Sequence, residues 1–237
     1  MLKRCLFTVA WLLALYGFSF AAITQNGSVC FASPESFASG SFAVSGSNRY
    51  LVVAVTSGGS IGTTVTGCTY AGMSMTELAN GSYLSSYASA LYGLLAPATG
   101  TNTLRCDVGI AANIVVSAVL YTGVDPTTPS HNVAAVADYS VTTVTLPVTS
   151  DTGEVVVSGI AASTTWSVSG GGTGICSTSV GSGFGGIAEF SGASTVNTSW
   201  GGPSDAVQTI AVSLIPVGGG PPPPPAVTPL RRKVISD

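Results

Sequence analysis

Charged side chains are scarce in this chain. Asp, Glu, Lys and Arg make up only 7% of its 237 residues, whereas about 25% is usual for soluble domains. Between Ala22 and Pro216 the only basic residues are Arg49 and Arg105, which with nine acidic residues leave a formal charge of −7. Because phosphate binding needs clustered Lys and Arg, we expect no nucleic-acid partner. Polarity must come from Ser, Thr, Asn and the backbone, a profile typical of exported β proteins.

The chain also lacks the motifs of common metal and redox centres. It has one histidine, His131, and no C-x-x-C pair, which argues against zinc and thioredoxin-type chemistry. It has no D-x-D-x-D loop, the usual calcium motif. No cofactor is therefore expected, and calcium is the one alternative for an acidic extracellular domain.

The N-terminal segment has the layout of a secretory signal. Lys3 and Arg4 precede an apolar run, and Ser19-Phe20-Ala21 offers small residues at the two positions that a signal peptidase reads. We predict cleavage after Ala21 and an extracellular or cell-surface location. The alternative is an uncleaved N-terminal membrane anchor, because Cys5 to Ile23 approaches the length of a bilayer span.

Removal of Cys5 with the signal leaves an even number of cysteines. An even count in an exported chain favours disulfides, and the alternative is four buried free thiols. We predict at least one disulfide and favour Cys68 with Cys106, since both lie in predicted strands. The candidates are Cys30, Cys68, Cys106 and Cys176.

The stretch from Asn48 to Thr76 shows the pattern that dominates the chain. Residues 50–55 are apolar at both odd and even positions, so this strand is expected at the centre of a sheet covered on both faces. β-branched density and closely spaced Gly argue against a helix. Gly58-Gly59 is interpreted as a hairpin turn.

Short apolar runs separated by turn residues continue to residue 215. We predict an all-β fold, an antiparallel β-sandwich of jelly-roll or immunoglobulin-like type. Segments 140–148 and 154–163 are expected to form a hairpin, and residues 169–186, rich in Gly and Ser, a mobile surface loop. The predicted organisation is a signal peptide (1–21), a sandwich domain (22–216), and a Gly/Pro-rich linker with a basic tail (217–237).

Several segments resemble a β-sandwich module that recurs in bacterial and phage surface proteins. The resemblance implies an extracellular, adhesin-like or appended binding module, and it implies no catalytic residues. It spans most of residues 48–129 and rests on these segments: Asn48–Val53, Val65–Thr76, Leu91-Tyr92, Pro97–Thr101 and Tyr121–Pro129.

Two sequence patterns resemble catalytic motifs without the context that those motifs need, and a set of carboxylates is a third catalytic possibility. Residues 58–62 match G-x-S-x-G around Ser60, but strand-like residues follow where a helix is required, and His131 is expected in an exposed loop. Residues 181–186 match G-x-G-x-x-G without a following helix. Carboxylate pairs for glycoside hydrolysis need only be close in space, and the candidates by residue type are Asp107, Asp125, Asp138 and Glu189.

Two aromatic residues next to Gly-rich segments are candidates for ligand binding. Trp166 offers a flat apolar face with a polar N–H, which suits stacking on a sugar or anchoring a protein, and Phe184 is expected to flank the same surface. The alternative is that Trp166 belongs to the core.

Three functions are compatible with these observations. We expect a secreted or surface-displayed, non-catalytic binding or adhesion module, with a cell-surface glycan or protein as its partner. The alternatives are a structural virion or appendage component that associates with copies of itself, and a carboxylate-dependent glycoside hydrolase.

Overall fold

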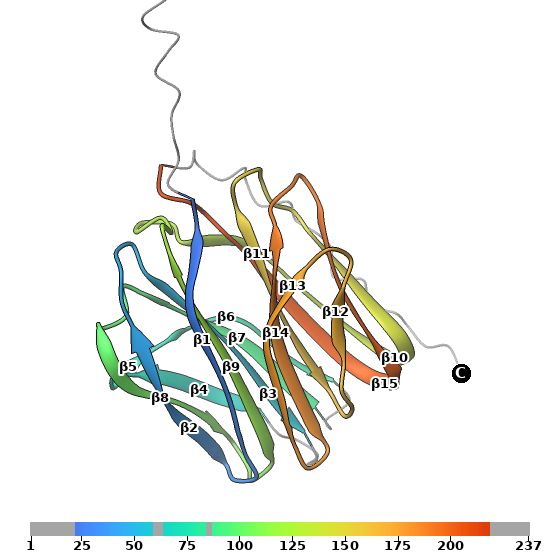
Figure 1. Cartoon of the computed structure of the whole chain (residues 1–237). Helices are drawn as coiled ribbons and strands as arrows, with labels where there is room; N and C mark the ends of the chain where they lie inside the picture. Colours follow the sequence, from blue (N-terminus) through green and yellow to red (C-terminus); the bar gives the residue numbers. More distant parts are fainter. Residues whose placement is uncertain (1–21, 59–63, 84–86, 219–237) are drawn as a thin grey trace, which may run out of the picture.

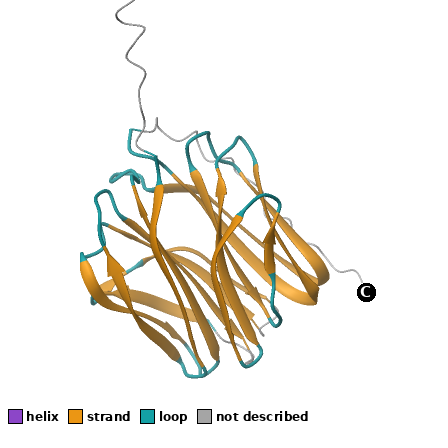
Figure 2. Cartoon of the chain, in the orientation of Figure 1, coloured by secondary structure: helices purple, strands orange, loops and turns teal. Residues whose placement is uncertain are grey.

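The computed structural model describes residues 22–58, 64–83 and 87–218. Figure 2 shows strands and loops only in this part, and every strand pairing is antiparallel. The predicted all-β antiparallel class is confirmed. Because the described residues form no helix, none of them forms a helix able to span a membrane.

The described strands form three stacked sheets (Figure 1). The outer sheet has the order β2 (Phe37–Val44), β8 (Gly100–Val108), β4 (Val65–Tyr70), β5 (Met73–Ser74). The central sheet has the order β1 (Thr24–Ser33), β9 (Asn113–Thr122), β3 (Tyr50–Gly58), β7 (Tyr87–Leu95), β6 (Thr76–Tyr83). The C-terminal sheet has the order β10 (Ser130–Val148), β15 (Val196–Leu214), β11 (Val155–Ala162), β14 (Gly183–Ser191), β13 (Thr173–Val180), and β12 (Ser167–Ser169) also pairs with β15.

The central sheet is covered on both faces, as its sequence predicts. All nine residues of β3 are buried. Leu51 and Val53 face the outer sheet, where they share a core with Tyr70 and Leu104. The side chains at the intervening positions, such as Val52, face the other way and share a second core with the C-terminal sheet. Burial on both faces explains why this strand is apolar at every position.

A third core lies on the far face of the C-terminal sheet. The long strands β10 and β15 pair over most of their length, with register shifts after Asp138 and Val141. Such bulges bend paired strands. Val144 of β10 and Trp200 of β15 lie in one half of this pair. Together with β12, this half shares a core with β11 and β14. The bent pair therefore covers a face that a single flat sheet would expose.

Two disulfides are present. Cys68 is bonded to Cys106 on the neighbouring strand of the outer sheet, with their Cα atoms 4.1 Å apart. Cys30 on β1 is bonded to Cys176 on β13, which joins the edge of the central sheet to the edge of the C-terminal sheet. The expectation of at least one disulfide is confirmed, and the pairing of Cys68 with Cys106 is the favoured one. Two disulfides indicate an oxidising, extracellular setting.

Three local predictions were wrong. Segments 140–148 and 154–163 follow each other in the chain but do not pair, because β15 lies between β10 and β11. Strands β3 and β4 belong to different sheets and do not pair, so they form no hairpin; residues 59–63 lie outside the described residues. The region 169–186 is not an irregular loop, because the hairpin of β13 and β14 begins within it.

The two ends of the described fold meet at Gly123. The amide of Val217 donates a hydrogen bond to the carbonyl of Gly123 at 2.9 Å. On the other side of Gly123, a Cβ atom would lie 2.5 Å from the carbonyl oxygen of Ala22. Gly123 has a φ of 75°, so both its conformation and its surroundings favour glycine. Ala22 and Val217 therefore lie at the same end of the described fold.

Candidate functional site

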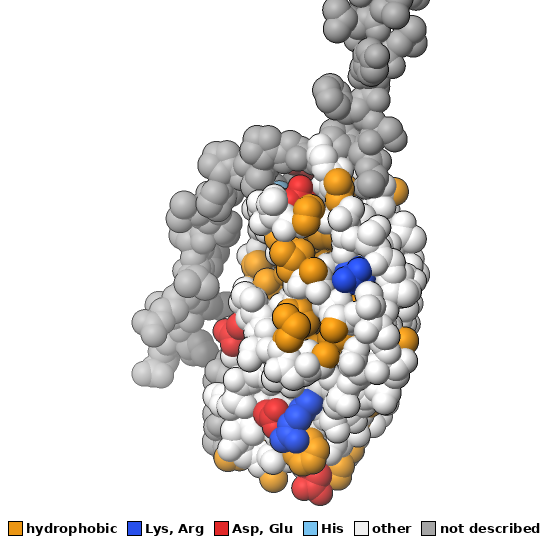
Figure 3. Space-filling view, turned by 90° about the vertical axis from the view of Figure 1, so that its left-hand side faces the viewer, with side chains coloured by type: hydrophobic (Ala, Val, Ile, Leu, Met, Phe, Trp, Pro, Cys, Tyr) orange, Lys and Arg blue, Asp and Glu red, His pale blue; other side chains and the backbone are white. Residues whose placement is uncertain are grey.

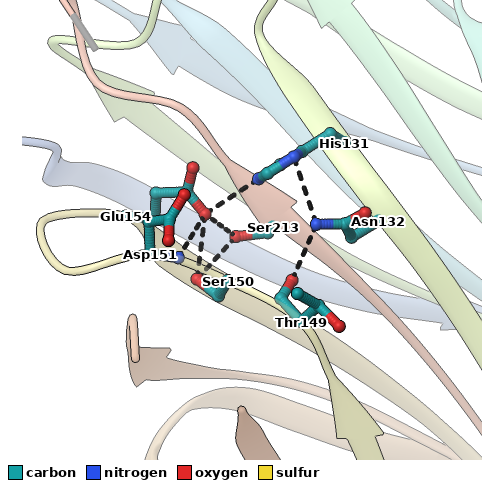
Figure 4. A network of polar contacts seen from close by, with 7 residues as sticks. All are labelled: His131, Asn132, Thr149, Ser150, Asp151, Glu154 and Ser213. Carbon is teal, nitrogen blue, oxygen red and sulfur yellow. Dashed lines mark hydrogen bonds and ion pairs between the residues drawn. The ribbon is translucent and has the colours of Figure 1, made fainter. Parts of the chain in front are cut away.

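A buried polar network occupies this end of the molecule. Figure 4 shows His131 from β10, Glu154 from the turn before β11 and Ser213 from β15 converging, with Ser150 from the turn below them. The Nε2 atom of His131 lies 2.9 Å from Oε2 of Glu154. The side chains of this pair are only 9% and 7% exposed. The expectation that His131 lies in an exposed loop was therefore wrong.

The Oε2 atom of Glu154 is the centre of this hydrogen-bond network. Besides His131, Ser213 donates to Oε2 at 2.7 Å, Ser150 at 3.0 Å and the amide of Asp151 at 2.9 Å. Burial alone would raise the pKa of Glu154, but the hydrogen bonds from His131, Ser213 and the amide of Asp151 outweigh it and lower the pKa below its ordinary value. The network holds an ionised carboxylate in a buried place.

This network lacks the geometry of a nucleophilic triad. In a triad the histidine contacts the nucleophile and the carboxylate orients the histidine. Here Glu154 lies between Ser213 and His131, and Ser213 is fully buried. Ser60, the serine of the G-x-S-x-G match, lies outside the described residues. We interpret the network as a structural element at the end where the chain ends meet.

A groove of about 420 Å³ lies between the edges of two sheets. Its outer-sheet side is formed by β4 and β5 and its central-sheet side by β6 and β7. The wall mixes hydroxyl groups and carboxylates with about as much apolar surface. It is lined by Thr66, Gly67, Cys68, Thr69, Ser74, Met75, Glu77, Tyr92 and Asp107.

Glu77 is the exposed carboxylate at the centre of a small hydrogen-bond group in this groove. Its Oε2 atom accepts from the hydroxyl of Tyr92 at 3.2 Å and from Nδ2 of Asn80 at 3.1 Å. Burial and then the negative charge of Glu77 raise the pKa of Tyr92 to about 12, so Tyr92 remains a hydroxyl donor at neutral pH. Tyr92 and Asn80 thereby fix the position of the Glu77 carboxylate.

The second carboxylate of the groove, Asp107, is paired with Arg105. The guanidinium donates to both carboxylate oxygens of Asp107, at 2.6 to 3.0 Å, and stacks over the ring of Phe37 at 4.1 Å. Figure 3 views the molecule from the side of the outer sheet, where apolar side chains gather in the middle and a basic and acidic group lies below them. Phe37, Met73 and Leu95 are among the exposed apolar residues, at 36%, 48% and 37%.

The predicted ligand-binding aromatics lie in the core. Trp166 is 2% exposed and Phe184 is 3% exposed, and both belong to the third core between the C-terminal sheet and its bent strands. The alternative interpretation of Trp166 as a core residue agrees with this position. Neither side chain is presented at the surface where a ligand could stack.

The predicted carboxylates do not converge on one place. Asp107 lies on the outer sheet, Asp138 on β10 and Glu189 on β14, where Glu189 accepts from the hydroxyl of Tyr121 at 3.1 Å. Asp125 accepts three hydrogen bonds from Thr127 and Thr128 within its own loop, which lower its pKa. The G-x-G-x-x-G match lies in the β13–β14 hairpin, without a helix N-terminus to hold a pyrophosphate.

The groove could not be predicted from the sequence, because the residues that line it form no motif along the chain. Glu77 and Asp107 are thirty positions apart, and only the folding of β6 and β8 into neighbouring sheets brings them to one groove. Among the described residues no group of three or more His, Cys, Asp or Glu side chains is placed to hold a metal ion. The calcium alternative therefore has no candidate ligand set in that part of the chain.

Comparison of the chain with protein-family models, with curated protein sequences and with solved structures finds no match.

Proposed function

We propose that the chain is an exported, surface-displayed binding module without catalytic activity, and that the groove beside β4 binds a carbohydrate. The observation that carries this proposal is the groove lining. Three hydroxyl side chains, the Tyr92 hydroxyl and the Glu77 carboxylate surround a space of about 420 Å³. Sugars are recognised by such convergent donors and acceptors, with apolar atoms such as those of Met75 against the ring faces.

The position of the two ends of the described fold supports surface display. Ala22 and Val217 both adjoin Gly123, so they lie at one end of the described fold. The sequence before Ala22 resembles a secretory signal, and the two disulfides suit an oxidising compartment. A domain attached through one end leaves its sides, including the groove, accessible to a host glycan.

The test is binding of the oxidised protein to an array of defined oligosaccharides, followed by calorimetry with those that bind. Glu77→Gln removes the charge and half of the acceptor capacity while it keeps the size, so affinity is expected to fall at least tenfold. Asp138→Asn makes the same change at an exposed carboxylate on β10 and should leave affinity unchanged. If no oligosaccharide binds, or if Glu77→Gln binds like wild type, the proposal is wrong.

A second candidate is the carboxylate-dependent glycoside hydrolase, because Glu77 and Asp107 line the same groove. We favour binding over hydrolysis because both oxygens of Asp107 already accept hydrogen bonds from Arg105. Incubation of the protein with the oligosaccharides that it binds distinguishes the two functions. Release of shorter sugars that stops in both Glu77→Gln and Asp107→Asn would establish the hydrolase.

A further inference from the structure

We propose that His131 and Asn132 form an acid-sensitive latch on the turn of residues 149–153, a property separate from the ligand groove. The latch consists of two contacts of one amide group. Nδ2 of Asn132 lies 3.0 Å from the carbonyl oxygen of Thr149 and 3.1 Å from Nδ1 of His131 (Figure 4). The Asn132 side chain thus connects β10 to the turn that precedes β11.

These contacts define the proton positions on the imidazole. A backbone carbonyl is only an acceptor, so the atom of Asn132 that faces Thr149 must be the amide nitrogen. The same nitrogen faces Nδ1 of His131, which must therefore be the unprotonated acceptor. The proton of the neutral ring then lies on Nε2 and is donated to Glu154, at 2.9 Å.

The backbone holds Asn132 in this position. Its φ is 50°, in the left-handed region that asparagine tolerates better than most residues. It lies in the register shift between His131 and Ala134, where β10 bulges against β15. From this bulge the Asn132 side chain reaches the turn, where it donates to the carbonyl of Thr149.

Protonation of His131 makes the arrangement impossible. A cationic imidazole carries N–H groups at both nitrogens, so Nδ1–H would face the N–H group of Asn132. Rotation of the amide by half a turn would satisfy Nδ1–H with Oδ1, but Oδ1 would then face the carbonyl oxygen of Thr149. In either case one contact of Asn132 is lost. The contact of Nε2 with Glu154 persists, so acid weakens the connection of the turn to Asn132 and keeps the ion pair.

The titratable groups around the imidazole of His131 are carboxylates and one tyrosine. The titratable groups on the elements around it are Glu154 and Asp151 of the turn, Asp125 of the loop before β10, and Tyr50, which contacts Ser130. β15 contributes Ser213, which does not titrate in this range. Carboxylates change charge near pH 4 and tyrosine near pH 10, whereas histidine ordinarily changes between pH 5 and 8.

The test uses the oxidised full chain, in which His131 is the only histidine and gives a single pair of ring nitrogen signals. At pH 8 nitrogen NMR is expected to show the proton on Nε2. As acid protonates the ring, the hydrogen-exchange protection of the Asp151 and Glu154 amides should fall at least fivefold. In the structure both amides are hydrogen-bonded within the turn.

Two variants and one control complete the experiment. Asn132→Ala is expected to show low protection of the turn at all pH values, and His131→Gln should show protection without pH dependence. Asn102→Ala removes an asparagine amide from the outer sheet and should change neither quantity. A proton on Nδ1 at pH 8, or turn protection that stays constant while the wild-type ring titrates, would overturn the proposal even if a variant failed to fold.

Discussion

Cys30 is bonded to Cys176 across 146 residues of sequence, and the bond joins the edges of two sheets that share no hydrogen-bonded strands. Cys68 and Cys106 are bonded within one sheet, across 38 residues, where β4 and β8 already pair. In the chain-entropy model a disulfide that closes a longer loop removes more freedom from the unfolded chain. The two bonds should therefore contribute unequally to stability.

We expect loss of either disulfide to lower the free energy of unfolding by about 2–5 kcal/mol, with the larger loss for Cys30–Cys176. Urea unfolding of the double variants Cys30→Ser/Cys176→Ser and Cys68→Ser/Cys106→Ser measures both values. A thiol assay of wild-type protein, unfolded without reductant, should detect no free thiol at these four positions. Titration of free thiols there, or a larger loss from the 68–106 pair, would contradict the expectation.

Trp166 should behave as a core residue rather than as a ligand platform. Trp166→Ala is expected to cost about 3–5 kcal/mol of stability, because it empties a large volume beside Val196 and Trp200. Trp166→Phe should cost less than Trp200→Phe by about 1 kcal/mol. The indole N–H of Trp200 donates to Ser158 at 3.1 Å, whereas that of Trp166 has no hydrogen-bond partner among the described residues. Thermal and urea unfolding of the three variants tests this order.

Because the carboxylate of Asp205 accepts several hydrogen bonds, we expect the protein to lose stability in acid. Burial alone would raise the pKa of Asp205, but hydrogen bonds from Ser163, Thr164 and the amide of Ala206 outweigh it and hold the pKa below its ordinary value. The carboxylate therefore contributes stability that is complete above its ordinary pKa of about 4 and is lost as pH falls through the lower folded value.

Asp205→Asn should cost about 1–2 kcal/mol at pH 7, after allowance for solvent screening, and less at pH 2 to 3. Urea unfolding at a series of pH values gives the comparison, and Asp138→Asn is the matched control on an exposed carboxylate. Equal costs at pH 7 and pH 2 would show that the ionised form of Asp205 is not the stabilising one.

The sequence predicted strands where burial leaves a simple pattern and failed where strands bend. Residues 50–55 are predicted as a central strand because they are apolar on both faces, and the observed strand β3 extends to Gly58. The predicted strand 140–148 is only part of the 19-residue strand β10. Turn-type residues such as Asn132 and Gly201 sit inside β10 and its partner β15, and the fold accommodates them as bulges.

The candidate site was less predictable than the fold. His131 and Glu154 meet only because β10 and the start of β11 lie on opposite sides of β15, an order that no local pattern encodes. Trp166 lies at a Gly-rich segment, which the sequence associates with an exposed loop. The bent half of β10 and β15 covers that segment and makes it part of the core.

The central and C-terminal sheets approach each other closely at Gly159. Gly159 in β11 faces Ala54 in β3, and a Cβ atom on Gly159 would lie 2.8 Å from the Cβ of Ala54. Real Cβ atoms do not approach this closely, so any side chain at position 159 must push the sheets apart. Close-packed interiors resist such shifts, and overpacking typically costs about 1–3 kcal/mol.

Gly159→Ala is therefore expected to lower the free energy of unfolding by about 1–3 kcal/mol, and Gly159→Val by more. Gly201→Ala is the matched control, because Gly201 also lies in a strand and its nearest neighbour, the carbonyl oxygen of Thr142, would be 3.7 Å from an added Cβ. That variant should be neutral or slightly stabilising, since Gly costs entropy within a strand. The double variant Gly159→Ala/Ala54→Gly removes the opposing methyl group and should recover most of the loss. If it recovers none, the contact between residues 54 and 159 is not what limits the spacing of the two sheets.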